Sequence, residues 1–312
     1  MKKRIFYIED PHITGFFGTA LQNIIFRQKN FPRYQYLIDT IKRNPNFEIR
    51  FYSSFTDTSI IPKLQWLITK KLELFLWRIF HGYANIKLET HIDKIENKDI
   101  FFTFAMQSSY ESNLIKGSTY KKISAQKIVH LCHFQIGTRY IQSNMKSLNP
   151  DYFIAVGPMF SNTFYTSTLT NDRVKNVVIP ERIQERFQPK KQNLARINKI
   201  LAIGTYETLE SYDRTDDYIK IMETDTLHHL RRDLATAFQD KSTDVFEIRL
   251  SDYNEKVKLA KNKFLRTLSK RQKKYFGFDM VEAFNQYSMF VCGEETIGKP
   301  TIGMLEGMAC GC

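Results

Sequence analysis

Long apolar runs, glycine and proline are all scarce in this sequence. No stretch reaches the roughly 18 uncharged apolar residues that a membrane-spanning helix needs. With 42% apolar and 25% charged residues, and only 13 glycines and 9 prolines among 312 residues, the composition favours a folded globular protein over a disordered one. The basic N-terminus leads into an apolar run from Ile5 to Ile8 only, which is too short for a secretory signal and predicts a first β-strand.

Cysteine is also rare. The four cysteines, at 132, 292, 310 and 312, do not form a disulfide framework. Cys310 and Cys312 are too close together to make a zinc site without other ligands. With no secretory signal, these features predict a cytoplasmic protein, either free or peripheral on the inner face of the membrane.

Positive charge is abundant. The 46 lysines and arginines against 33 acidic residues leave a formal net charge of +13, which favours an anionic partner: a nucleic acid, the inner-leaflet surface or a phosphorylated substrate. A basic nucleic-acid-binding protein would need a helix-turn-helix, a zinc knuckle or aromatic-rich sheet motifs. None is present in the sequence, so nucleic acid is the disfavoured partner.

Apolar runs of strand length alternate with helical patterns along the chain. Strands are expected within 5–8, 47–54, 99–106, 127–134, 151–157, 174–181, 199–206, 244–250 and 288–293, and helices within 62–81, 216–238, 255–272 and 279–287. This alternation predicts an α/β protein with parallel sheets. The length suits two domains. We therefore expect two Rossmann-like domains, 1–180 and 181–312, facing each other across a cleft.

The C-terminal stretch EETIGKPTIGMLEGMACG follows the last predicted strand and should line a ligand site. Gly298 and Gly303 allow close approach of a ligand to the backbone, and a helix that starts near 301–303 offers N–H groups to a phosphate. Glu306 lies one turn further on, where its carboxylate would accept hydrogen bonds from sugar or ribose hydroxyls. The alternative interpretation is an ordinary helix whose small residues pack tightly against a sheet.

The residues GMLEGMACG resemble the signature of the GT-B, group 1 (family 4) glycosyltransferases. Further segments of that family are resembled, in chain order, by PDYFIAVGPMFSNTF (150–164), VVIPERIQERFQP (177–189) and KILAIGTY (199–206). The likeness covers about 127–312. It implies a GT-B fold and transfer of a sugar, with retention, from a nucleoside-diphosphate sugar to a surface polysaccharide or lipid-linked acceptor. The N-terminal domain would bind the acceptor and the C-terminal domain the donor.

The resemblance also implies roles for particular residues. Glu306 corresponds to the family's ribose-binding acid, and Gly303 to the phosphate site. Glu294 and Glu295 lie upstream of Gly298, which occupies the region of the family's sugar-binding acid, so either is a candidate for the sugar contact, with Glu295 as a catalytic candidate. His133 directly follows the KIVHLC strand (127–132), where the family often carries a histidine near the reaction centre.

The arginine that usually follows the first glycine of the C-terminal domain is missing. Gly204 is followed by Thr205, so the base that binds the diphosphate must come from elsewhere, and Arg214 and Lys299 are the candidates from chemistry and order. On the acceptor side, Gly15 and Gly18 match the glycine loop after the first strand, and His12 lies beside them. The alternative for that loop is a plain tight turn.

No metal or other cofactor is expected, because the sequence has no DxD motif after a strand and no clustered His and Asp ligands. The family continues with another strand and several helices after this motif, so the resemblance implies a C-terminal domain that stops early, either truncated or naturally short. A non-catalytic partner subunit of the same fold, and an epimerase or phosphorylase on that fold, are therefore alternatives to the transferase.

Two segments combine basic with apolar side chains. Residues 64–83 mix Trp66, Phe75, Trp77 and Phe80 with Lys70, Lys71 and Arg78, and residues 255–274 hold nine basic residues and one acid. The first suits an interfacial helix on an anionic membrane or, alternatively, a core helix with a basic outer edge. The second predicts a helix with outward lysines, either a solvated face or an attachment surface near lipid-linked substrates.

Overall fold

The structure is a computed structural model. It describes residues 3–9, 35–53, 61, 64, 67–68, 71–72, 74–75, 78–79, 86–105, 120–131, 145–156, 160, 165, 173–179, 183, 186–190, 195–206, 228–239, 241–252, 280–293 and 301–312. The chain divides into two compact units, the first made of Met1–Ala155 and Ser167–Ile179 and the second of Val156–Thr166 and Pro180–Cys312. The sequence-based division assigns 156–166 to the first domain, whereas these residues group with the second unit.

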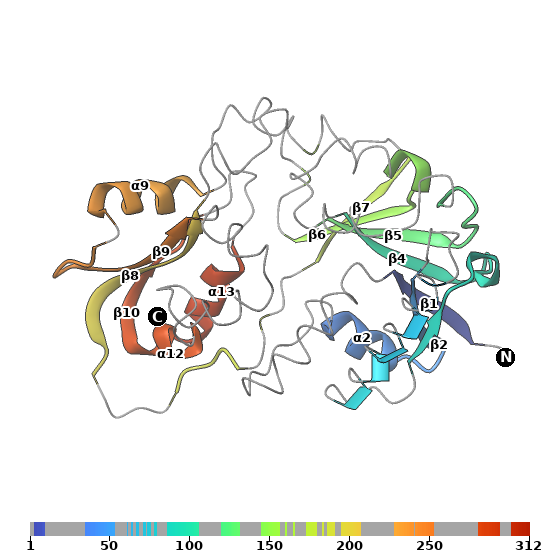
Figure 1. Ribbon diagram of the computed structural model, residues 1–312, viewed down its shortest axis with the longest axis horizontal. Coiled ribbons are helices and arrows are strands. Elements are labelled where there is room, and N and C mark those ends of the chain that lie inside the picture. The colour runs from blue at the N-terminus through green and yellow to red at the C-terminus, as the bar shows by residue number, and fades with distance from the viewer. Residues whose placement is uncertain are drawn as a thin grey trace. The chain divides into compact units, whose positions relative to one another are not determined.

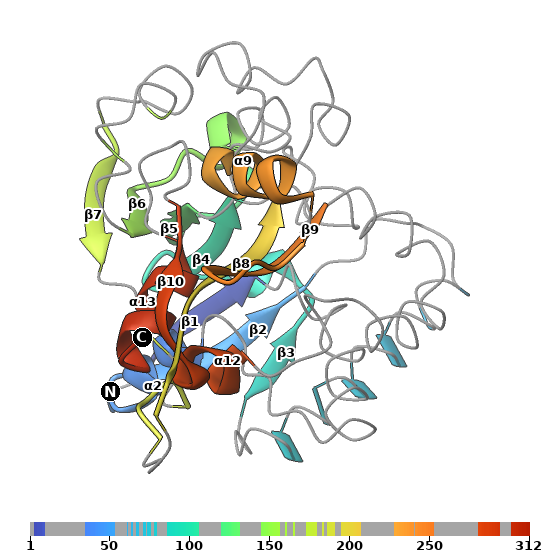
Figure 2. The same ribbon diagram turned by 90° about the vertical axis from the view of Figure 1, so that its left-hand side faces the viewer.

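The first unit is built on a seven-stranded sheet. Its strands are β1 (Arg4–Glu9), β2 (Phe47–Tyr52), β3 (Lys87–Glu89), β4 (Ile100–Ala105), β5 (Gln126–Leu131), β6 (Tyr152–Val156) and β7 (Lys175–Ile179), with helix α2 (Gln35–Lys42) and the short 3-10 helix η1 (Ile92–Lys94). The strand order is β3-β2-β1-β4-β5-β6-β7, and the pairs from β3 to β6 are parallel (Figure 2). This order is compatible with a Rossmann-like domain, and the predicted α/β class is confirmed.

The alternation of side chains along β1 divides the core of the first unit into two layers. Phe6 and Ile8 point to one face, where they pack with Ile38 of α2 and with Phe51. Tyr7 and Glu9 belong to the other face, because successive side chains of a strand point to opposite sides. Both faces of the central strand are therefore buried, which explains why the run Ile5 to Ile8 has no polar alternation.

The second unit has a three-stranded parallel sheet of order β10-β8-β9. Its strands are β8 (Ile197–Tyr206), β9 (Phe246–Asp252) and β10 (Tyr287–Val291), and its helices are α9 (His229–Phe238), α12 (Met280–Gln286) and α13 (Ile302–Ala309). Helix α9 covers one face of this sheet, and α12 and α13 cover the other (Figure 1). Each apolar run that was expected to form a strand overlaps one of the observed strands. Strand β3 was not expected.

Arg196 links the start of β8 to the start of β10 and to the C-terminal end of α13. Its Nη1 donates to the carbonyl oxygens of Gly311 at 2.6 Å and Tyr287 at 3.2 Å, and its Nη2 donates to that of Cys310 at 2.7 Å. Cys310 and Gly311 end α13, so one guanidinium serves carbonyls that the helix itself leaves without partners. Arg196 thereby joins β8, β10 and α13 at one edge of the sheet.

We expect Arg196→Gln to lower the free energy of unfolding by at least about 2 kcal/mol, because hydrogen bonds from a charged donor to several carbonyls are lost together. Urea denaturation followed by circular dichroism measures the change. Arg186→Gln is the matched control, since Arg186 is exposed and lies over the Phe187 ring at 4.8 Å. Arg186→Gln should lower the free energy of unfolding by about 1 kcal/mol or less. Equal losses in the two variants would contradict a special role for Arg196.

Candidate functional site

Three of the residues predicted to form a site fall within the described part of the chain: Gly204, Gly303 and Glu306. Nine lie outside the described residues, namely His12, Gly15, Gly18, His133, Arg214, Glu294, Glu295, Gly298 and Lys299. The described three belong to the second unit, at the carboxyl-terminal end of β8 and on α13. The candidate site is therefore built from this part of the second sheet.

Gly204 lies close to a guanidinium that the sequence did not point to. Its φ is +138°, a conformation that side chains rarely adopt, and a Cβ built there would meet Cζ of Arg231 at 2.6 Å and its Nη1 at 2.7 Å. Arg231 comes from the first turn of α9. Glycine at position 204 thus lets the cation rest against the end of β8, where the resemblance led us to expect an arginine at position 205.

The same guanidinium reaches across the edge of the sheet to the end of β10. Nη2 of Arg231 lies 3.9 Å from Sγ of Cys292, and that thiol is hydrogen-bonded to the hydroxyl of Thr301, the N-cap residue of α13. A Cβ on Gly303 would lie 3.8 Å from Cys292 Sγ. Arg231, Cys292 and the first turn of α13 therefore form one connected corner beside Gly204.

The small residues of α13 have a structural purpose as well. A Cβ at position 307 would come within 2.6 Å of the Phe290 ring, so only glycine lets this helix lie so close to β10. The tight packing that the sequence offered as the alternative interpretation is thus present at Gly307, where α13 lies against β10. Glu306, the neighbouring residue, is also largely buried, with 9% of its surface exposed.

Arg231 and two histidines, His228 and His229, lie at the start of α9. Burial lowers the pKa of His228 to about 3, and the positive charges of Arg231 and His229 add to this effect, so the His228 imidazole is neutral near pH 7. The N-termini of α9 and α13 add partial positive charge from their backbone N–H groups. Arg231 and these two helix ends therefore contribute positive charge at this corner.

The topology of the sheet makes this corner a natural binding site. From β8 the chain passes to β9 on one side through α9, whereas β10 lies on the other side and is followed by α13 on the opposite face. Strands whose connections leave in opposite directions open a crevice at their carboxyl ends, where ligands of open α/β sheets bind. Gly204 and Cys292 stand on the two sides of that point. We call Gly204, Arg231, Cys292, Thr301 and Gly303 the switch-point corner.

The sequence did not point to Arg231 because the helix before β9 was expected to start near 216, which puts residues 228–232 toward its C-terminal half. The structure begins α9 at His229. A helix that follows a parallel strand begins at the strand's carboxyl edge. The basic HHLRR run at the true helix start was therefore the available signal.

The first sheet carries a buried carboxyl group at its own switch point, between β1 and β4. Glu9 ends β1 and is 1% exposed. It accepts a hydrogen bond from the hydroxyl of Thr103 on β4 and others from the Tyr120 hydroxyl, at 3.0 Å to Oε2 and 3.2 Å to Oε1. Burial raises the pKa of Glu9 to about 7, against the two hydroxyl donors, which lower it. The acid that ends the first apolar run was the only sequence signal for this cluster.

Glu9 makes stability depend on pH. Between pH 4.5 and about 7 the unfolded chain releases this proton while the folded chain keeps it, so stability falls as pH rises through that window. The expected loss is about 3 kcal/mol. Glu9→Gln removes this titration. The free energy of unfolding of the variant, relative to that of the parent protein, should therefore increase as pH rises across the window.

Urea denaturation at several pH values between 4.5 and 7 measures this difference. Glu96→Gln is the control, because its side chain is 46% exposed. Parallel stability curves for Glu9→Gln and the parent protein would show that the Glu9 carboxyl titrates in the same way in the folded and unfolded states.

Comparisons of this chain with protein-family models, with curated proteins and with solved structures find no match. Among the described residues, no group of three or more His, Cys, Asp or Glu side chains is arranged to hold a metal ion. No helix of the described part is both long and apolar enough to cross a bilayer. The sequence motifs and the two sheet edges are the grounds for a functional proposal.

Proposed function

We propose that the chain is a glycosyltransferase that moves a sugar, with retention, from a nucleoside-diphosphate sugar onto a polysaccharide or lipid-linked acceptor. The observation that carries this proposal is the position of Arg231 over Gly204 at the switch-point corner. The GMLEGMACG signature on α13 supports it. The proposal includes a GT-B arrangement, in which two Rossmann-like domains face each other across a cleft.

The diphosphate of the donor would bind at the switch-point corner. The Arg231 guanidinium presents several N–H donors in a planar fork that matches phosphate oxygens, and it is always charged. The N-terminal turn of α13, with Gly303, offers backbone N–H groups to the same anion. Arg231 would then take the role that the resemblance assigns to the arginine missing at position 205.

The chemistry fits this placement. In sugar transfer the bond between the anomeric carbon and the diphosphate oxygen breaks, and its electron pair leaves with the nucleoside diphosphate. A new bond forms between the anomeric carbon and an acceptor hydroxyl, whose proton is released. Negative charge grows on the departing diphosphate, and a fixed guanidinium and helix N-terminus stabilise it without reorganising. This role for the protein requires no metal ion.

Glu306 would hold the nucleoside. It lies one turn beyond Gly303 on α13, so a ribose next to the diphosphate would bring its hydroxyls toward this carboxylate. His133, Glu294 and Glu295 remain the proposed residues around the sugar, and His12, Gly15 and Gly18 those around the acceptor. Gly298, Lys299 and Arg214 remain proposed donor contacts beside Arg231.

Calorimetric titration with a panel of UDP-, GDP-, CDP- and ADP-sugars, without added metal, tests the proposal. We expect saturable binding of one base class, and Arg231→Gln should weaken it at least about tenfold, because a charge-assisted contact to phosphate is lost. Arg232→Gln is the matched control, since the next residue of α9 pairs with Asp233 instead. The proposal fails if no nucleotide sugar binds, or if the two variants bind alike.

Glu306 can be tested separately. We expect Glu306→Ala to weaken the same binding by about 1 to 3 kcal/mol, because the ribose hydroxyls lose their acceptor. The nucleoside diphosphate alone should show the same loss, whereas inorganic pyrophosphate, which has no ribose, should bind both proteins equally. Unchanged nucleotide affinity in a folded variant would make Glu306 a purely structural residue of α13.

A further inference from the structure

The segment 61–79 displays a row of large apolar side chains to solvent. The described residues of this segment are helical. Six of them are between 44% and 79% exposed: Ile61, Leu64, Ile68, Leu72, Phe75 and Ile79. Their spacings of three and four residues put them on one face of a helix. We call these six residues the apolar stripe.

Other residues of the segment attach it to the first unit. Leu74 is 7% exposed and packs in the core cluster that contains Ile38 and Phe51. Nη2 of Arg78 donates to the carbonyl oxygen of Ile86, just before β3, at 2.6 Å. Since this inner side is held by core packing and a hydrogen bond, the apolar stripe is presented outward by the body of the unit.

An exposed stripe of this kind differs from ordinary surface apolar residues. The other large apolar side chains exposed in the described part, such as Val178 and Val245, occur singly or as a pair on separate elements. Scattered residues need no explanation, whereas a contiguous apolar face marks a docking surface. The predicted core-helix alternative for this segment accounts for Leu74 and does not account for the stripe.

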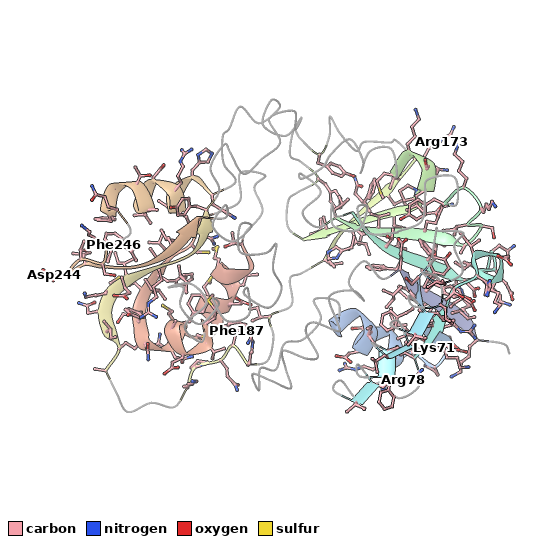
Figure 3. All side chains as sticks on the ribbon, in the orientation of Figure 1. Lys71, Arg78, Arg173, Phe187, Asp244 and Phe246 are labelled. Carbon is pink, nitrogen blue, oxygen red and sulfur yellow. The ribbon has the colours of Figure 1, made fainter. Side chains whose placement is uncertain are left out.

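The charge around the stripe identifies the kind of partner. Lys71 is exposed and lies three residues after Ile68 and four before Phe75, at the edge of the stripe, and Figure 3 labels it together with Arg78. Between 61 and 80 the sequence has four basic residues, Lys63, Lys70, Lys71 and Arg78, against the single acid Glu73, in a chain of net charge +13. Basic side chains beside an apolar face complement an anionic lipid surface, where the apolar face enters the acyl boundary and the lysines remain at the headgroups.

We propose that the apolar stripe and Lys71 form a docking surface for an anionic phospholipid bilayer. The helix lies in the plane of the interface, with Ile68, Leu72 and Phe75 below the headgroups and the first unit above them. The long-range attraction of the positive net charge brings the chain to the bilayer, and apolar burial holds it there. This proposal stands without the glycosyltransferase proposal, because it rests only on the surface of the first unit.

Co-sedimentation of the full chain with vesicles of phosphatidylcholine, with and without phosphatidylglycerol, tests the docking surface. We expect binding to the mixed vesicles, weaker binding to the neutral ones, and a decrease with added salt. The double variant Ile68→Ser with Phe75→Ser should bind the mixed vesicles at least about tenfold more weakly. Lys71→Gln should bind about fivefold more weakly, with the loss confined to anionic vesicles.

The matched control is Val178→Ser with Val245→Ser, which removes two side chains of 58% and 56% exposure away from the stripe and should leave vesicle binding unchanged. Circular dichroism and thermal unfolding establish that each variant is folded, as expected for substitutions at exposed positions. The proposal is overturned if the stripe variant binds as the parent does, or if the folded parent binds no vesicles. It is also overturned if sedimentation velocity shows a lipid-indifferent dimer that the stripe variant dissociates, because the stripe would then pair with a second copy of the chain.

Discussion

The second unit depends on the guanidinium of Arg196 at the edge of the sheet opposite to the proposed donor site. A helix C-terminus and the start of a strand both expose carbonyl oxygens, and here a single cation from the residue before β8 serves α13 and β10 together. Once these ends are tied, the lengths of β8 and β10 determine where their other ends fall. Gly204 and Cys292 lie near each other at the carboxyl edge because β8 and β10 pair in parallel up to Ala202 and Val291.

Two glycines show how close packing and a possible ligand site share one feature. Gly307 lets α13 lie against the Phe290 ring, and Gly204 lets Arg231 lie against β8. The first contact is purely steric and would suit any helix on any sheet. The second places the positive charge of a half-buried arginine at a switch point. Gly204 and Arg231 therefore distinguish the proposed site from ordinary helix packing better than the small residues of α13 do.

The sequence predicted the strands well, whereas the predicted site residues stay predictions. Parallel strands buried on both faces appear as apolar runs, so β1 and β4 are recognisable without a structure. Strand β3 has only three residues and leaves no such run. Arg231 is 27 positions after Gly204, and Thr103 and Tyr120 are 94 and 111 positions after Glu9. Contacts over such distances depend on the fold, and a single sequence carries no period that reveals them.

The close approach of Arg231 to Gly204 also constrains how this chain can diverge. Any side chain at position 204 would occupy the space of the guanidinium and would have to adopt a backbone conformation that only glycine adopts easily. A smaller residue at position 231 would free that space but would remove the charge. Replacing Arg231 would therefore relieve the crowding at position 204, whereas the positive φ would still favour glycine there.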